Sequence, residues 1–129
     1  MHIEGNRVEV KKSQKEMFVF LTNLKNFEQL MPESIQKFEV DGDSFVFALK
    51  GMPEIRLVLK EATEFTNLTL GAASSKLDFE LVVDIEPINE TSCEVQLNFK
   101  GKFNAMMAMM VKKPLTSFIE TLSKNIEQV

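Results

Sequence analysis

Few residues of this chain have the types needed for catalysis, and their spacing does not bring them together. His2 is the single histidine and Cys93 the single cysteine. A metal site needs several His, Cys or carboxylate ligands that converge, and a nucleophilic cysteine needs a base beside it. The sequence shows neither, and Cys93 is better explained as a small buried residue. We therefore predict no catalytic residue, no metal ligand and no cofactor.

The other charged candidates lie within predicted strands. Arg56 is one of two arginines, and it would reach a ligand carboxylate only if its face pointed inward. Its neighbours Ile55 and Leu57 favour an outward position. Four carboxylates also alternate with apolar residues, as expected of a solvated strand face rather than a catalytic pair: Asp78, Glu80, Asp84 and Glu86.

Composition indicates one globular domain over residues 1–129. The net charge is −4 with scattered lysines, so we expect no nucleic-acid partner. No apolar run reaches the roughly 20 residues of a transmembrane helix. The start of the chain lacks the apolar region of a signal peptide, and the lone cysteine fits a cytoplasmic location. Eleven Phe without Tyr or Trp indicate an apolar interior rather than a polar recognition surface.

The first third of the chain predicts a strand followed by two short helices. Residues 2–11 form a candidate strand, and Ser13-Gln14-Lys15-Glu16 has the capping-box pattern that opens a helix. Asn26 is the expected cap of a second, very short helix that Pro32 ends.

From residue 38 the apolar residues recur with the period of a strand. Asp41-Gly42-Asp43 predicts a hairpin, and a break is expected at 51–53. Further strands are expected over 55–60, 65–70, 77–86 and 93–103, with Leu77 facing inward and a loop over 71–75. This alternation predicts an antiparallel sheet with one buried face. Residues 104–128 have helical spacing, with Asn104 as cap and Pro114 expected to kink or restart the helix.

Two stretches carry a resemblance to a known superfamily. One is the run from Val8 to Phe18, continuing through Leu24, Phe27, Leu30, Met31 and Pro32. The other is the final helix after a strand that ends in Lys100-Gly101-Lys102-Phe103. Together they resemble the START-related SRPBCC superfamily, which includes polyketide cyclase-like and birch-pollen-allergen-like proteins.

The resemblance covers essentially the whole chain. It implies an α+β helix-grip fold: a curved antiparallel sheet wraps around a long C-terminal helix, with two short helices after the first strand. Members bind lipids, sterols, hormones or polyketides, and some are enzymes. They share no single catalytic motif, so none is carried over to this sequence.

A set of large apolar residues is expected to face inward and to line a cavity between the sheet and the final helix, if one exists. The candidates are Phe45, Phe47, Leu57, Leu59, Phe79, Leu81, Leu97, Phe99, Met107, Val111 and Phe118. The same side chains could instead fill a solid core, and the sequence leaves both possibilities open.

A methionine cluster at the start of the final helix is the most informative local feature. At about 100° per residue, Met106, Met109 and Met110 fall opposite the stripe that contains Val111 and Phe118. A break near Pro114 would turn them inward. Otherwise a loop, a partner subunit or an apolar ligand would cover them, and they are candidates for an interface or a pocket mouth.

The sequence and the resemblance leave three alternative hypotheses for the function. The first is non-catalytic binding of a small apolar molecule, such as a lipid, a fatty acid or a polyketide-like compound. The second is an enzyme of cyclase or hydratase type, which would need ionisable groups in the interior. The third is an interaction module or homodimer that uses the methionine cluster.

Overall fold

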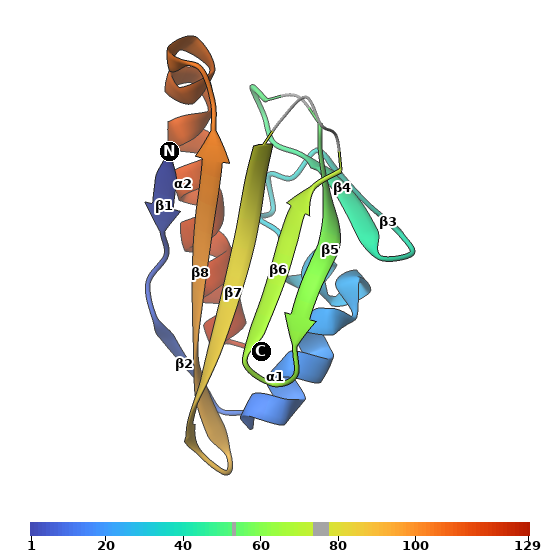
Figure 1. The fold of residues 1–129 in the computed structure, drawn as a ribbon, viewed down its shortest axis with the longest axis vertical. Coiled ribbons are helices and arrows are strands. Elements are labelled where there is room, and N and C mark those ends of the chain that lie inside the picture. The colour runs from blue at the N-terminus through green and yellow to red at the C-terminus, as the bar shows by residue number, and fades with distance from the viewer. Residues whose placement is uncertain (53, 74–77) are drawn as a thin grey trace.

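The chain folds into one antiparallel sheet with a long helix across it (Figure 1). The computed structural model describes residues 1–52, 54–73 and 78–129. Its elements are β1 (His2–Glu4), β2 (Val8–Val10), α1 (Gln14–Thr22), the 3₁₀ helix η1 (Leu24–Leu30), β3 (Lys37–Asp41), β4 (Ser44–Ala48), β5 (Ile55–Thr63), β6 (Asn67–Ala72), β7 (Asp78–Asn89), β8 (Ser92–Lys102) and α2 (Ala105–Glu127).

The sheet is a meander whose N-terminal strands return to its last strand. The order is β1-β8-β7-β6-β5-β4-β3, and β2 also pairs with β8. The pairings are antiparallel throughout, so the predicted helix-grip α+β architecture is confirmed. The helix α2 contacts β1, β2, β8 and η1, and therefore lies over one side of the sheet.

Local sequence signals explain several of these boundaries. The capping box is present: the backbone N–H of Glu16 donates to Ser13 Oγ at 3.1 Å, and the N–H of Ser13 donates to Glu16 Oε1 at 3.2 Å. The Ser13 backbone N–H, followed by its hydroxyl, lowers the pKa of the Glu16 carboxyl. The predicted hairpin joins β3 and β4 through Gly42, whose φ of +61° suits a residue without a side chain.

The structure corrects the caps and ends of several predicted elements. Residues 2–11 form two short strands instead of one. The second short helix begins at Leu24 and is capped by Asn23, whose Oδ1 accepts from Lys25 N at 3.3 Å. Asn26, the predicted cap, instead donates its side-chain amide to Phe20 O at 2.9 Å. Tertiary packing decides which of the two asparagines caps the helix, and a local sequence pattern does not encode that packing.

The strand β6 is shifted relative to its prediction. It begins at Asn67 and continues through Ala72, so the expected loop over 71–75 is wrong for its first two residues. Phe65 lies in the preceding turn with φ +67°, and its ring packs edge-on against Phe18 at 5.7 Å. Ala73, the next residue of the expected loop, lies outside the strand, as predicted. The predictions for Leu77, for Pro53 and for residues 74–75 lie outside the described residues.

Pro114 does not restart α2, which is one continuous helix from Ala105 to Glu127. The carbonyl of Met110 loses its helical donor at Pro114. Met110 lies on the exposed side of α2, and the helix continues through Pro114 without a break.

Candidate functional site

The predicted lining residues do come together, in one apolar cluster between the sheet and α2. All of them are buried except Leu59 and Met107, which are partly buried and pack against the others. Leu59 lies next to a bulge in the pairing of β5 with β6, where the regular alternation stops. Whether these residues ever line a cavity stays a prediction.

Stacked phenylalanines connect α2 to the distant strands of the sheet. Phe118 of α2 stacks on Phe47 of β4, with ring centroids 4.7 Å apart and planes 8° from parallel. Phe45, on the same strand, stacks on Phe27 of η1 at 5.2 Å. Such pairs each contribute roughly 0.5–1.5 kcal/mol beyond the area they bury. The interior under the middle of α2 is thus held by aromatic side chains.

A surface groove of about 190 Å³ lies against this interior. It lies between α2 and the connections that precede β3 and follow β4. Its lining residues are Pro32, Ser34, Leu49, Lys50, Pro114, Ser117, Phe118 and Thr121. Leu49 and Phe118 belong both to the groove wall and to the buried core, at 7% and 3% exposure. Two side chains of the apolar cluster therefore form part of the groove wall and separate the groove from the interior.

The polar groups that are buried in the described part of the chain already have partners. They belong to Ser44, Ser92 and Ser123. Ser44 Oγ donates to Asp41 O at 2.9 Å, Ser92 Oγ bonds Asn89 Oδ1 at 3.0 Å, and Ser123 Oγ donates to Ile119 O at 2.9 Å. No described hydroxyl is left free in the interior to bind or activate a substrate.

Arg56 points outward, as predicted. It is exposed, and its Nη1 donates to Ser44 Oγ at 3.0 Å. It therefore does not present a cation to the interior.

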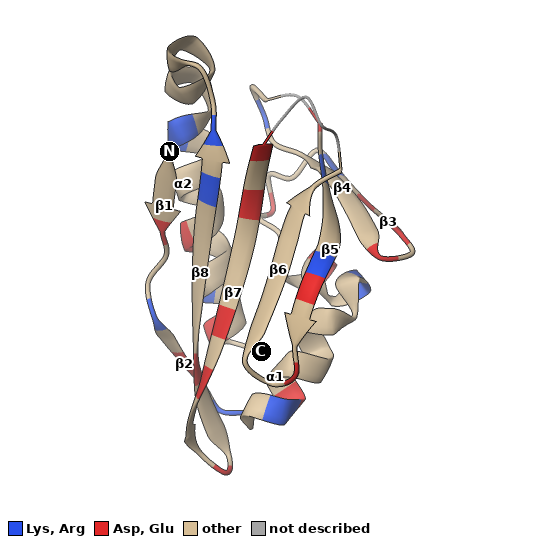
Figure 2. Cartoon of the chain, viewed as in Figure 1, with Lys and Arg blue, Asp and Glu red and all other residues tan. Residues whose placement is uncertain are grey.

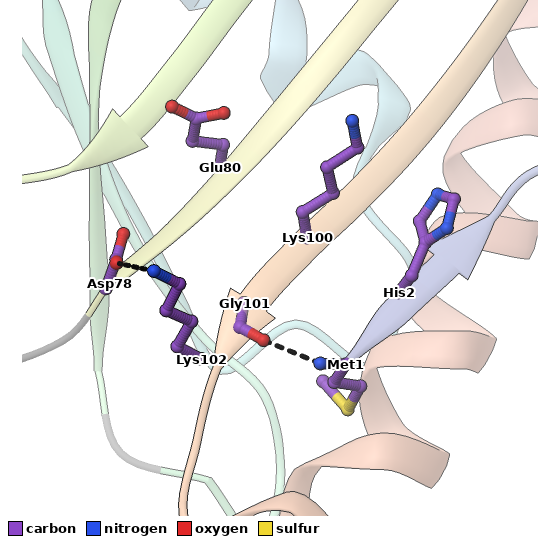
Figure 3. A pocket seen from close by; sticks show the side chains of 7 residues that line it. All are labelled: Met1, His2, Asp78, Glu80, Lys100, Gly101 and Lys102. Carbon is purple, nitrogen blue, oxygen red and sulfur yellow. Dashed lines mark hydrogen bonds and ion pairs between the residues drawn. The ribbon is translucent and has the colours of Figure 1, made fainter.

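A second, charged groove of about 480 Å³ lies on the outer face of β1, β7 and β8 (Figure 3). Sequence reasoning missed it, because it forms only where β1 and β7 both pair with β8, which places His2 on one side of Lys100 and Glu80 on the other. Asp78 pairs with Lys102 Nζ at 3.9 Å, and Glu80 lies on the same exposed face. Glu86 is also exposed, and the half-buried Asp84 accepts from the side-chain amide of Asn67 at 2.8 Å, so the four carboxylates lie on the outer face of β7, as predicted.

The apolar hollow on α1 is the third candidate. It measures about 510 Å³ and is lined by residues that include Lys12, Val19 and Phe20. It does not reach the predicted lining residues, so it is the weaker candidate for the ligand site.

Cys93 is buried at the start of β8, opposite Val10. Burial raises the pKa of its thiol, and the negative charge of Glu16 adds to this effect. A neutral thiol in this position is a poor nucleophile.

The raised pKa predicts a pH dependence of stability. An unfolded cysteine loses its proton near pH 8.5, whereas the folded chain, in which the pKa of this thiol is raised, keeps it to a higher pH. The free energy of unfolding should therefore be unaffected below about pH 8.5 and should fall as the pH rises above it. Urea unfolding of wild type and Cys93→Ala from neutral to alkaline pH measures this loss of stability. The variant is the reference, since it has no ionisable thiol at this position. A difference between the two proteins that does not change with pH would contradict the burial of the thiol.

The methionines at the start of α2 are exposed. Met106, Met109 and Met110 have exposed fractions of 75%, 83% and 56%, on the side opposite Val111 and Phe118 that the helical period predicts. The alternative of an inward turn at Pro114 is wrong. Their role at an interface or a pocket mouth stays a prediction.

Within the described ranges, no three His, Cys, Asp or Glu side chains gather as metal ligands would. None of the described helices combines the length and the apolar character needed to cross a bilayer.

Comparison with known proteins gives the fold only. No protein-family model matches the chain, and no curated protein matches its sequence. Solved structures do match. A START superfamily protein from Mycobacterium smegmatis is 13% identical, with a TM-score of 0.67 over 98% of this chain and 97% of the other. A conserved protein from Geobacillus kaustophilus is 14% identical, with a TM-score of 0.70 over 99% and 93%.

Norcoclaurine synthase from Thalictrum flavum, solved in complex with dopamine and hydroxybenzaldehyde, also matches. It is 12% identical, with a TM-score of 0.68 over 99% of this chain and 87% of the other. The similar structures thus include an enzyme as well as proteins without a stated activity. The fold is compatible with both binding and catalysis. This chain has the helix-grip fold of START-like proteins, as its resemblance in sequence implied.

Proposed function

We propose that the chain binds a small apolar molecule between the sheet and α2, without carrying out chemistry on it. The observation that carries this proposal is the double role of Leu49 and Phe118, which form both the wall of an open groove and part of the buried core. A molecule in the groove would contact Leu49 and Phe118, and only these side chains would separate it from the apolar interior.

The interior favours binding over catalysis. The described buried polar groups are serines that already have hydrogen-bond partners. General acid–base catalysis needs an ionisable side chain within hydrogen-bond reach of the substrate. The cyclase or hydratase alternative would have to place such a group here, whereas an apolar ligand needs only contact area.

The groove also indicates which ligand would fit. Its volume of about 190 Å³ is below the roughly 300 Å³ at which ordinary ligand pockets begin. Uptake therefore requires Phe118 or Leu49 to move, and we expect affinity in the micromolar range or weaker. Lys50 at the rim supplies a cation, and Ser117 and Thr121 line the same groove with hydroxyls. An apolar tail with a carboxylate head, as in a fatty acid, fits this arrangement.

The test is native mass spectrometry of the purified protein followed by titration with a medium-chain fatty acid. Ser117→Trp places a large ring in the groove at an exposed position of α2, and should abolish binding. Glu120→Trp, on an exposed part of the same helix outside the groove lining, is the matched control and should bind as wild type does.

The rim cation has its own test. Lys50→Ala should weaken the fatty acid by at most about fivefold, because exposed ion pairs are weak, and should leave the corresponding alcohol unaffected. Absence of saturable binding in the wild-type protein, or full binding by Ser117→Trp, would remove the proposal.

A further inference from the structure

A cationic, methionine-rich surface lies at the start of α2, and the ligand proposal does not use it. We call it the methionine face: Met106, Met109, Met110, Lys112 and Lys113. All five are exposed. The helix is regular here, since Asn104 Oδ1 accepts from the N–H of Met107 at 2.8 Å. Figure 1 shows the first turns of α2 extending beyond the end of β8.

Helical spacing places the charge among the sulfur side chains. Lys113 follows Met109 by four residues and Met110 by three, so the three side chains share one face. Lys112 follows Met109 by three residues and lies at the edge of this face. On the opposite side Val111 is buried, and Met107 and Ala108 are half-buried. The helix start therefore has one partly buried apolar side and one exposed side that is both apolar and cationic.

The charged residues on the first turns of α2 are all positive, although the chain carries −4 overall. The first acidic residue of α2 is Glu120, beyond the methionine face. The adjoining end of β8 adds no net charge, because Lys100 lies opposite Glu80 of β7 and Lys102 pairs with Asp78 at 3.9 Å. Figure 2 shows these lysine bands on β8 and α2, with acidic bands at the neighbouring end of β7.

We propose that the methionine face docks onto the surface of an anionic lipid bilayer. Apolar side chains flanked by lysines on one helix face are the pattern of helices that lie in the membrane interface. The methionines would enter the boundary between headgroups and acyl chains, while Lys112 and Lys113 would meet the phosphates. Each lysine near such a surface contributes favourably, and the effect decays within a Debye length.

A second copy of the chain fits the same face less well. In a two-fold contact a surface meets itself, so Lys112 and Lys113 would face the same lysines without an acidic partner on these turns. Stable dimers also bury about 20–30 residues on each side, far more than this face provides. Charge complementarity thus favours the bilayer.

The location fits the ligand proposal without depending on it. Pro114, one turn after Met110, lines the groove that leads to Phe118. A docked molecule would hold that groove close to the lipid. Docking and ligand binding can nevertheless be measured separately.

The experiment is co-sedimentation with vesicles of phosphatidylcholine, alone or with one third phosphatidylglycerol. Wild type should bind the anionic vesicles, should bind pure phosphatidylcholine far less, and should be released by salt. Met109→Glu with Met110→Glu should abolish binding and leave both the melting temperature and fatty-acid titration in solution unchanged. Replacing Lys112 or Lys113 by Ala should weaken binding roughly fivefold each.

The matched control is Val19→Glu with Ile88→Glu, which changes two other exposed apolar residues, at 57% and 46% exposure. It should bind vesicles as wild type does. Equal vesicle binding by the methionine variant, or no binding by wild type at low salt, would overturn the proposal. A concentration-dependent dimer in light scattering that the methionine variant abolishes, without vesicle binding, would assign the face to a second copy instead.

Discussion

Replacing Phe47 by Ala is expected to lower the free energy of unfolding by about 3–5 kcal/mol, the usual cost of removing a buried phenylalanine. The Phe47 ring is 1% exposed and stacks on Phe118 at 4.7 Å. Its removal leaves a cavity at the point where α2 is joined to β4, and the continuous helix cannot collapse to fill it. Urea or thermal unfolding of the variant measures the loss.

Phe20→Ala is the control, because this ring is only partly buried on α1, and its removal should cost much less. A double-mutant cycle with Phe118→Ala should give a coupling of roughly 0.5–1.5 kcal/mol beyond the area term. If Phe47→Ala costs no more than Phe20→Ala, the interior is not packed as described.

The second large effect is expected at Gly5, in the corner between β1 and β2. A Cβ there would lie 2.6 Å from Leu97 O and 3.1 Å from both Ile119 Cγ2 and Ser123 Oγ. The N–H of Gly5 also donates to Leu97 O at 2.7 Å. Gly5→Ala must therefore push the corner away from both β8 and α2, and we expect a loss of about 2–3 kcal/mol, the upper part of the range for overpacking.

Gly42→Ala is the matched control. Its φ of +61° is unfavourable for alanine, but no atom lies within 4 Å of the added Cβ, so the cost should be about 1 kcal/mol. Thermal melts of the two variants, followed by circular dichroism, compare the two costs: Gly42→Ala reports backbone strain, and Gly5→Ala reports a steric clash with neighbouring atoms. A smaller loss at Gly5 than at Gly42 would contradict the close approach of β1, β8 and α2.

The features predicted correctly from the sequence are those set by residues close together in the chain. The capping box at Ser13 and Glu16 involves one helical turn, and the hairpin at Gly42 involves one tight turn. The exposure of Met109 follows from helical phase alone. The meander and its covering helix then follow from the alternation and from the connections, since short turns require antiparallel neighbours.

The features that could not be predicted from the sequence depend on contacts between segments that are far apart in the chain. Asn23 rather than Asn26 caps η1, because tertiary packing sets where that helix begins. The bulge after Leu59 interrupts an alternation that looks regular in the sequence. The groove between Leu49 and Phe118 joins segments almost seventy residues apart, and no local signal marks its polar rim. Whether large apolar residues fill or line an interior also depends on this packing.

The central claim, an apolar ligand between the sheet and α2, is tested most directly by mapping its position. Two-dimensional ¹H–¹⁵N spectra of the protein, recorded during titration with a medium-chain fatty acid, report every backbone amide that the ligand perturbs. We predict saturable shifts at Leu49, Lys50, Ser117, Phe118 and Thr121, extending to Phe47. Saturable shifts confined to Val19 and Phe20 on α1 or to the outer face of β8, or shifts that never saturate, would contradict the account.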